Sequence, residues 1–129
     1  MLSKVNSFGV FGIEAYPIEI EVDITQGLPA TNIVGLPDAS VKESKERIKS
    51  AIKNSGFHFP PERITVNLAP SDIKKEGSCF DLAIALGILA ASQQLNNERL
   101  KDYYLLGELS LDGSLRATQG VLPIAAAIA

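Results

Sequence analysis

The sequence has few of the residues from which metal centres and disulfides are built. It contains one cysteine, Cys79, and one histidine, His58. A structural zinc site takes four nitrogen or sulfur ligands, and a disulfide takes two cysteines, so neither is expected within this chain. The single thiol, together with an N-terminus that lacks an apolar secretory leader, favours a reducing cytoplasm.

Several sequence patterns are missing as well. Neither of the phosphate-binding patterns GxxxxGK[ST] and GxGxxG occurs, so we expect this chain by itself to hold no ATP and no other cofactor. The longest apolar run, residues 82–91, is too short to cross a bilayer. The formal net charge of -3 excludes a strongly basic nucleic-acid binder, although a local basic patch remains compatible with it.

The length and the pattern of apolar residues predict one folded domain. The length is 129 residues, which suits a single core. In the segment 18–24, isoleucine and valine alternate with glutamate and aspartate, a period of two that predicts a half-buried strand with an acidic outer face. Three further strands are expected at 7–12, 32–35 and 63–68.

Two helices are predicted between these strands. The first runs from Ala39 to Ser55, with Asp38 or Ser40 as its N-cap; Ser40 and Glu43 have the spacing of a capping box. The second runs over 79–95 and is apolar on nearly every side, which is typical of a helix inside a core.

A hairpin and an incomplete helix are expected at the end of the chain. The segments 103–111 and 114–118 flank Asp112-Gly113, which favours a type I′ turn. The order of elements predicts an α+β (mixed α/β) domain with a mixed sheet, two main helices and a C-terminal hairpin. Residues 122–129 look like the start of an uncapped apolar helix, so we expect the natural chain to continue.

One region could hold a nucleophile. Ser78 and Cys79 stand where a loop meets the second helix, and a helix N-terminus can lower the pKa of a thiol. The alternative is that Ser78 is the N-cap, paired with Asp81 at capping-box spacing, and that Cys79 only fills the first turn. We favour capping, because caps are far commoner than nucleophiles. His58, between two phenylalanines, is interpreted as a surface or packing residue.

Lysines suggest one surface for DNA. Lys42, Lys49 and Lys53 share a face of the first helix, and Lys74 and Lys75 form a second cluster. Such stripes can bind phosphates. Acidic residues interrupt the stripe, however, so a solvated face with ion pairs between neighbouring turns explains it too, and we favour that interpretation.

Four strings of residues carry a family resemblance that covers nearly the whole chain. They are GLPDASVKES at 35–44, NLAPSDIKKEGS at 67–78, FDLAIA at 80–85 and GELSLDG at 107–113. The sequence resembles the N-terminal domain of the Mg-chelatase-related AAA+ ATPases, the ComM/YifB family. The resemblance implies a single domain over 1–129, followed in the natural protein by an AAA+ module that binds ATP and Mg²⁺.

That domain is similar to the proteolytic domain of Lon proteases and to one domain of a small-subunit ribosomal protein, which implies a left-handed βαβ fold. Lon proteases use a serine at a helix start and a lysine on a later helix. The resemblance puts Cys79 at the serine position, with Ser78 as the less favoured register. The lysine position falls near Leu122, and 117–129 contains no lysine or arginine. A nucleophile without a base keeps its proton, so the resemblance implies the fold without the protease chemistry.

The expected function is a non-catalytic accessory domain. The resemblance implies that the whole protein is a cytoplasmic, hexameric, ATP-dependent motor on branched DNA in natural transformation or recombination. Partners are then the AAA+ module, neighbouring subunits and, at the lysines, DNA, with no membrane. The alternatives are an altered hydrolase that uses Cys79, a magnesium chelatase ATPase subunit, and a free-standing binding module.

Overall fold

The computed structural model describes residues 1–11, 14–96 and 98–116. Strands β1 (Leu2–Phe11), β2 (Glu14–Thr25) and β3 (Ala30–Val34) come first, followed by helix α1 (Ala39–Asn54), strand β4 (Arg63–Ala69) and helix α2 (Asp81–Ala91). A short 3-10 helix η1 (Leu100–Asp102) and the strands β5 (Glu108–Leu109) and β6 (Leu115–Arg116) complete the order. This order confirms the predicted mixed α+β class.

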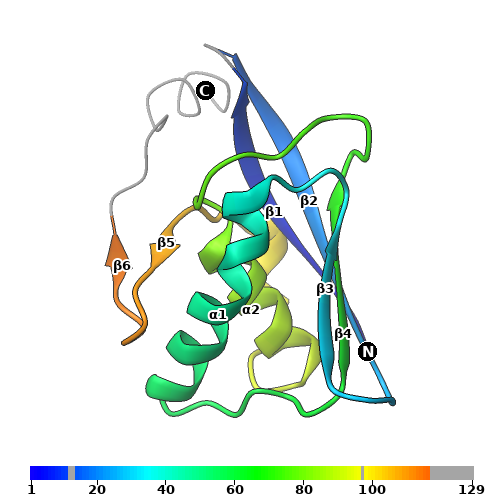
Figure 1. The fold of residues 1–129 in the computed structure, drawn as a ribbon, viewed down its shortest axis with the longest axis vertical. Coiled ribbons are helices and arrows are strands. Elements are labelled where there is room, and N and C mark those ends of the chain that lie inside the picture. Colours follow the sequence, from blue (N-terminus) through cyan, green and yellow to red (C-terminus); the bar gives the residue numbers. More distant parts are fainter. Residues whose placement is uncertain (12–13, 97, 117–129) are drawn as a thin grey trace.

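Four strands form one mixed sheet in the order β1-β2-β4-β3. β2 pairs antiparallel with both β1 and β4, whereas β3 runs parallel to β4 and reaches it through α1. α2 packs on β1 and β2 and also contacts α1, so both helices cover the same face of the sheet (Figure 1).

The alternation in β2 divides the sheet into two faces as predicted. Its four branched side chains are buried under the helices, while Glu19 and Asp23 on the opposite face are exposed. Burying one apolar face in this way fixes the register, because a slip of one residue would place the carboxylates in the core. Glu21, on the same outer face, accepts a hydrogen bond from Asn67 of β4 at 2.8 Å.

α2 lies in the core, as its composition predicts. Ile84 and Ile88 are each 1% exposed. A Cβ at Gly87 would come within 2.7 Å of Val22 Cγ2, so only glycine lets the helix approach β2 this closely. The helix is not buried all round, however, because Leu82 and Leu86 are only half-buried.

The structure decides between the two N-caps predicted for α1 and corrects the predicted start of α2. Asp38, rather than Ser40, caps α1: its Oδ1 accepts a hydrogen bond from Val41 N–H at 2.8 Å. α2 begins at Asp81 with no side-chain cap, two residues later than predicted, and ends at Ala91. The prediction that Ser78 is the N-cap was therefore wrong; its main-chain oxygen accepts from Asp81 N–H instead.

The hairpin exists, with a different turn and much shorter strands. Gly113 has a φ of 91°, but Asp112 is outside the positive-φ region, so the turn is not type I′. Gly113 N–H donates to Ser110 O, and Ser110 N–H donates to Ser114 O. This is a three-residue loop in which glycine takes the left-handed position. The predicted extension to residue 118 and the apolar segment 122–129 lie outside the described residues.

Candidate functional site at the start of helix α2

The loop before α2 is fastened to the start of α1. Lys75 N–H donates to Leu36 O, and Asp38 N–H donates to Lys75 O, both at 2.9 Å. The Asp38 carboxylate, which caps α1 through Oδ1, also accepts from Gly77 N–H through Oδ2 at 3.2 Å. One carboxylate thus holds together a helix start and the loop that carries the candidate nucleophiles.

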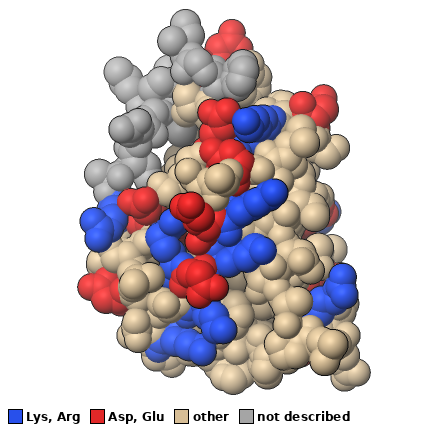
Figure 2. Space-filling view, viewed as in Figure 1, with Lys and Arg blue, Asp and Glu red and all other residues tan. Residues whose placement is uncertain are grey.

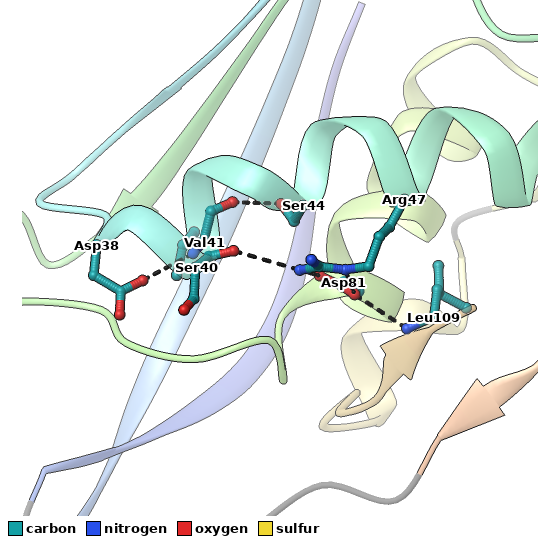
Figure 3. Close-up of polar contacts among 7 residues, drawn as sticks. All are labelled: Asp38, Ser40, Val41, Ser44, Arg47, Asp81 and Leu109. Atoms are coloured by element: carbon teal, nitrogen blue, oxygen red, sulfur yellow. Dashed lines mark hydrogen bonds and ion pairs between the residues drawn. The ribbon is translucent and has the colours of Figure 1, made fainter. Parts of the chain in front are cut away.

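An ion pair whose carboxylate is buried and whose guanidinium is partly exposed lies beside this junction (Figure 3). Arg47 Nε donates to Asp81 Oδ2 at 2.8 Å, and Arg47 Nη2 donates to Asp81 Oδ1 at 3.2 Å. Leu109 N–H adds a third hydrogen bond to Oδ2 at 3.1 Å. The pair therefore joins α1, α2 and β5 at one point.

The electrostatics of the pair follow from its burial. Asp81 is fully buried, and this burial raises its pKa, against the hydrogen bonds from Arg47 and Leu109 that favour the charged form. The hydrogen bond to Asp81 raises the pKa of Arg47. Both oxygens of Asp81 accept hydrogen bonds from the protein, Oδ1 from Arg47 and Oδ2 from Arg47 and Leu109 N–H, which is the pattern of a structural carboxylate.

Cys79 sits in surroundings that keep its thiol neutral. The side chain is half-buried, and burial raises its pKa to about 11. The nearby carboxylates of Asp81 and Asp38 act in the same direction. A reactive cysteine needs a lowered pKa, so this position does not activate a thiolate at neutral pH.

The first N–H groups of α2 are also engaged. Asp81 N–H donates to Ser78 O at 3.3 Å, and Leu82 N–H donates to Gly107 O at 3.0 Å. An oxyanion hole needs donors aimed at the reacting oxygen. Here those two donors serve the fold, and the Cys79 carbonyl likewise accepts from Gly107 N–H at 3.0 Å.

His58 lies at the opposite end of α2. Its N–H donates to Gln94 Oε1 at 2.8 Å, and its carbonyl accepts from Gln94 Nε2 at 2.6 Å. The helix is eleven residues long, which makes it about 16 Å from end to end. His58 therefore cannot reach Cys79 as a base. The predicted lysine position, Leu122, lies outside the described residues.

The lysines predicted for DNA contact do not form one surface. Lys42, Lys49 and Lys53 are exposed along α1, and Lys74 is exposed on the loop. Lys75 is buried, 2% exposed, and its Nζ donates to Pro70 O; this burial lowers its pKa. Its inclusion in a phosphate-binding cluster was wrong, because the loop folds its side chain inward.

On α1 the lysines are interleaved with acidic residues. Figure 2 shows blue and red atoms mixed over this helix rather than a continuous basic stripe. Lys49 Nζ lies 5.8 Å from the centroid of the Phe59 ring, a cation–π contact. The exposed lysines thus belong to a mixed charged face, one edge of which borders the connector between α1 and β4.

Little in the amino-acid sequence signals the Arg47–Asp81 pair. Its one local signal is an aspartate that opens an otherwise apolar helix, where a charge needs a partner. Among the residues that the structure describes, no three His, Cys, Asp or Glu side chains gather as metal ligands. Across the same residues, no helix is long and apolar enough to cross a membrane.

Comparison with known proteins defines the class. A family model described as subunit ChlI of Mg-chelatase matches residues 20–129. The chain is 49% identical over 121 residues to YifB of Escherichia coli (strain K12), an alignment that covers 94% of this chain and 24% of that protein. It is 48% identical over 122 residues to the competence protein ComM of Haemophilus influenzae, covering 95% of this chain and 24% of that protein.

The domain is therefore of the Mg-chelatase ChlI type. Within that class, the chain belongs to the ComM/YifB family, as the strings in the sequence predicted. It spans about a quarter of the length of the curated relatives that it matches.

Proposed function

We propose that this chain is a non-catalytic accessory domain of a Mg-chelatase-related AAA+ ATPase. The ATP and Mg²⁺ sites lie in a separate AAA+ module of the complete protein, and the domain packs beside the ring of subunits which that module forms. The complete protein is a cytoplasmic hexameric motor that moves branched DNA. The similarity to a protein named as a competence protein supports this role.

We further propose that the fold is of the Lon-protease type, with a left-handed β3-α1-β4 crossover. The mixed sheet supports it, since β3 and β4 are parallel neighbours joined by α1 and a second helix follows β4. The position of Cys79 just before α2 fits the place where Lon proteases carry their nucleophile.

One observation carries the non-catalytic part of the proposal: the N–H groups of Asp81 and Leu82 at the start of α2 donate to Ser78 O and Gly107 O. Burial of the adjacent Cys79 thiol, which raises its pKa to about 11, points the same way. A general base typically contributes on the order of a hundred- to ten-thousand-fold in rate, and His58 is at the wrong end of α2. The buried Arg47–Asp81 pair gives this junction a structural role instead. A neutral thiol with no base beside it disfavours the altered hydrolase. The match to ChlI keeps a magnesium chelatase subunit as the second candidate.

Two measurements test the proposal. The chain should not cleave unfolded casein or small peptide esters, and a serine-reactive phosphonate should not label Ser78. Cleavage that disappears in Cys79→Ala and survives in Lys49→Ala would overturn the non-catalytic assignment.

For the motor, the complete protein should hydrolyse ATP faster when branched DNA is present. A version without residues 1–116 should keep basal ATP hydrolysis but lose assembly or DNA-coupled turnover. ATP hydrolysis stimulated by a porphyrin and chelatase subunits, and not by DNA, would favour the second candidate.

A further inference from the structure

The open edge of the main sheet borders a groove. β3 is the last strand in the order β1-β2-β4-β3, and β4 is its only partner among the described strands. A groove of about 360 Å³ lies between the start of β3, the exposed side of α1 and the connector before β4. Its lining includes Ala30, Thr31, Lys45, Lys49, Lys53 and Phe59.

The backbone of β3 has hydrogen-bonding groups that face away from the sheet. Ala30 N–H donates to Glu62 O at 3.4 Å, so Ala30 directs its peptide groups toward β4. Alternate residues of a strand point their peptide groups in opposite directions. Thr31 and Ile33 therefore direct their N–H and C=O groups outward, and such an edge is a template for another strand.

The lysines are spaced to meet a strand laid along this edge. Lys45, Lys49 and Lys53 are four residues apart on α1, a rise of about 6 Å per step. Side chains on one face of a strand repeat every 6.6–6.8 Å or so. All three lysines line the groove together with Ala30 and Thr31 of β3, so alternate side chains of an added strand that point into the groove would meet successive ammonium groups.

We propose that the β3 edge binds an extended acidic segment of a partner protein. The segment adds as a strand beside β3, hydrogen-bonds to the outward groups of Thr31 and Ile33, and directs alternate carboxylates to the three lysines. Its remaining side chains lie on the outer face of the sheet next to Ala30 and Val34, which are exposed.

The groove fits this partner better than two others. Pairing of two β3 edges about a two-fold axis would bring two rows of lysines together, and like charges at close range repel. A nucleic acid carries a charge at every phosphate, so some phosphates would face Glu46 and Glu62, which also line the groove, whereas an acidic strand can place its carboxylates opposite the lysines alone. An acidic strand needs a charge only at alternate residues and uses backbone groups that a nucleic acid leaves unpaired.

The test measures fluorescence anisotropy of a labelled seven-residue peptide in which glutamate alternates with valine, titrated with the 129-residue chain. The triple variant Lys45→Glu, Lys49→Glu, Lys53→Glu should weaken binding by at least about tenfold, because it reverses the complementary charges. The control is a triple variant that makes the same change in net charge outside the groove: Lys4→Glu, Lys42→Glu, Lys74→Glu. Its affinity for the peptide should stay within about twofold of that of the unchanged protein.

A second variant isolates the backbone contribution. Thr31→Pro removes an outward N–H and leaves the ladder to β4 intact, as proline on an edge strand can; binding should fall by about tenfold or more with an unchanged circular dichroism spectrum. A peptide with a central proline makes the same comparison without altering the protein. Equal binding of both peptides would overturn the proposal. The proposal would also be overturned if an oligothymidylate bound as tightly as the glutamate-valine peptide. The same holds if the chain formed a dimer that Thr31→Pro dissociates.

Discussion

Arg47 and Asp81 form a bidentate ion pair that joins the two helices of this domain, with the carboxylate fully buried and the guanidinium at its edge. The pair lies immediately behind the loop that carries Ser78 and Cys79. Leu109 N–H donates a third hydrogen bond to the Asp81 carboxylate. Together these bonds fix the first residue of α2 against α1 and β5.

Removing one member of this pair should destabilise the fold strongly. Asp81→Ala leaves Leu109 N–H without its acceptor and leaves the guanidinium only its hydrogen bond to Ser40 O at 3.4 Å. Loss of one partner of a buried pair costs about 3–5 kcal/mol. The double variant Arg47→Met, Asp81→Leu should cost less than the sum of the single changes, since no charge is then stranded. Urea unfolding measures both. Glu43→Ala, an exposed change on α1, is the control and should stay within about 0.5 kcal/mol. A loss that small for Asp81→Ala would contradict the structural role.

Cys79 should make stability depend on pH in the alkaline range. Its pKa is raised from 9.0 to about 11 in the fold, so the folded state holds the proton more tightly than the unfolded chain. The stabilisation is complete below about pH 9 and is lost as the pH rises toward 11, for a total of about 2–3 kcal/mol. Cys79→Ser should lack this component when urea unfolding of the two proteins is compared across that range.

The alkylation rate of the native thiol gives an independent reading of the same pKa. Its pH profile should rise with a midpoint near 11. A midpoint below neutrality would instead reveal an activated thiolate and revive the hydrolase alternative.

The exposed lysines of α1 and the loop should contribute little to DNA binding. With Lys42, Lys49, Lys53 and Lys74 changed to Glu, the complete protein should bind branched DNA with an unchanged dependence on salt, because acidic residues already interrupt this face. Each lost phosphate contact would lower the magnitude of the salt slope by about 0.9. A slope reduced by several such steps would show that the lysines do form a phosphate-binding surface. Lys75 is left out because it is buried.

Gly35 should tolerate no side chain. Its φ is +99°, and a Cβ there would collide with the main-chain oxygen of Leu68 in β4. Gly35→Ala should therefore cost about 3 kcal/mol, from strain and from displacement of the strand. Gly56→Ala is the matched control: its φ is +87° and nothing lies within 4 Å of the added atom, so only the backbone strain of about 1–2 kcal/mol should appear. If the two variants lost equal stability in thermal unfolding, β4 would have to shift away from the added methyl group at little cost.

The sequence was sufficient for the order of the main strands and helices and for the family, but not for the bounds of each element. The alternation in β2 and the apolar composition of α2 reflect burial directly, because a strand or helix must place its apolar residues against a core. Long strings such as NLAPSDIKKEGS identified the family because a match at so many consecutive positions is uncommon in unrelated proteins. Local preference was a weaker guide at helix starts. Ser78 has the chemistry of a cap, yet α2 begins at Asp81, because packing of the loop against α1 decides where the helix starts.

Only the tertiary structure decided which polar residues work together. Arg47 and Asp81 are 34 residues apart, and nothing in either local sequence says that they meet; the meeting follows from how α1 and α2 pack on one face of the sheet. Lys74 and Lys75 are neighbours with opposite fates, one exposed and one buried, because the path of the loop over Leu36 and Asp38 turns a single side chain inward. Sequence patterns record the energy of burying each element, whereas a site depends on contacts between elements, and those are fixed when the whole chain folds.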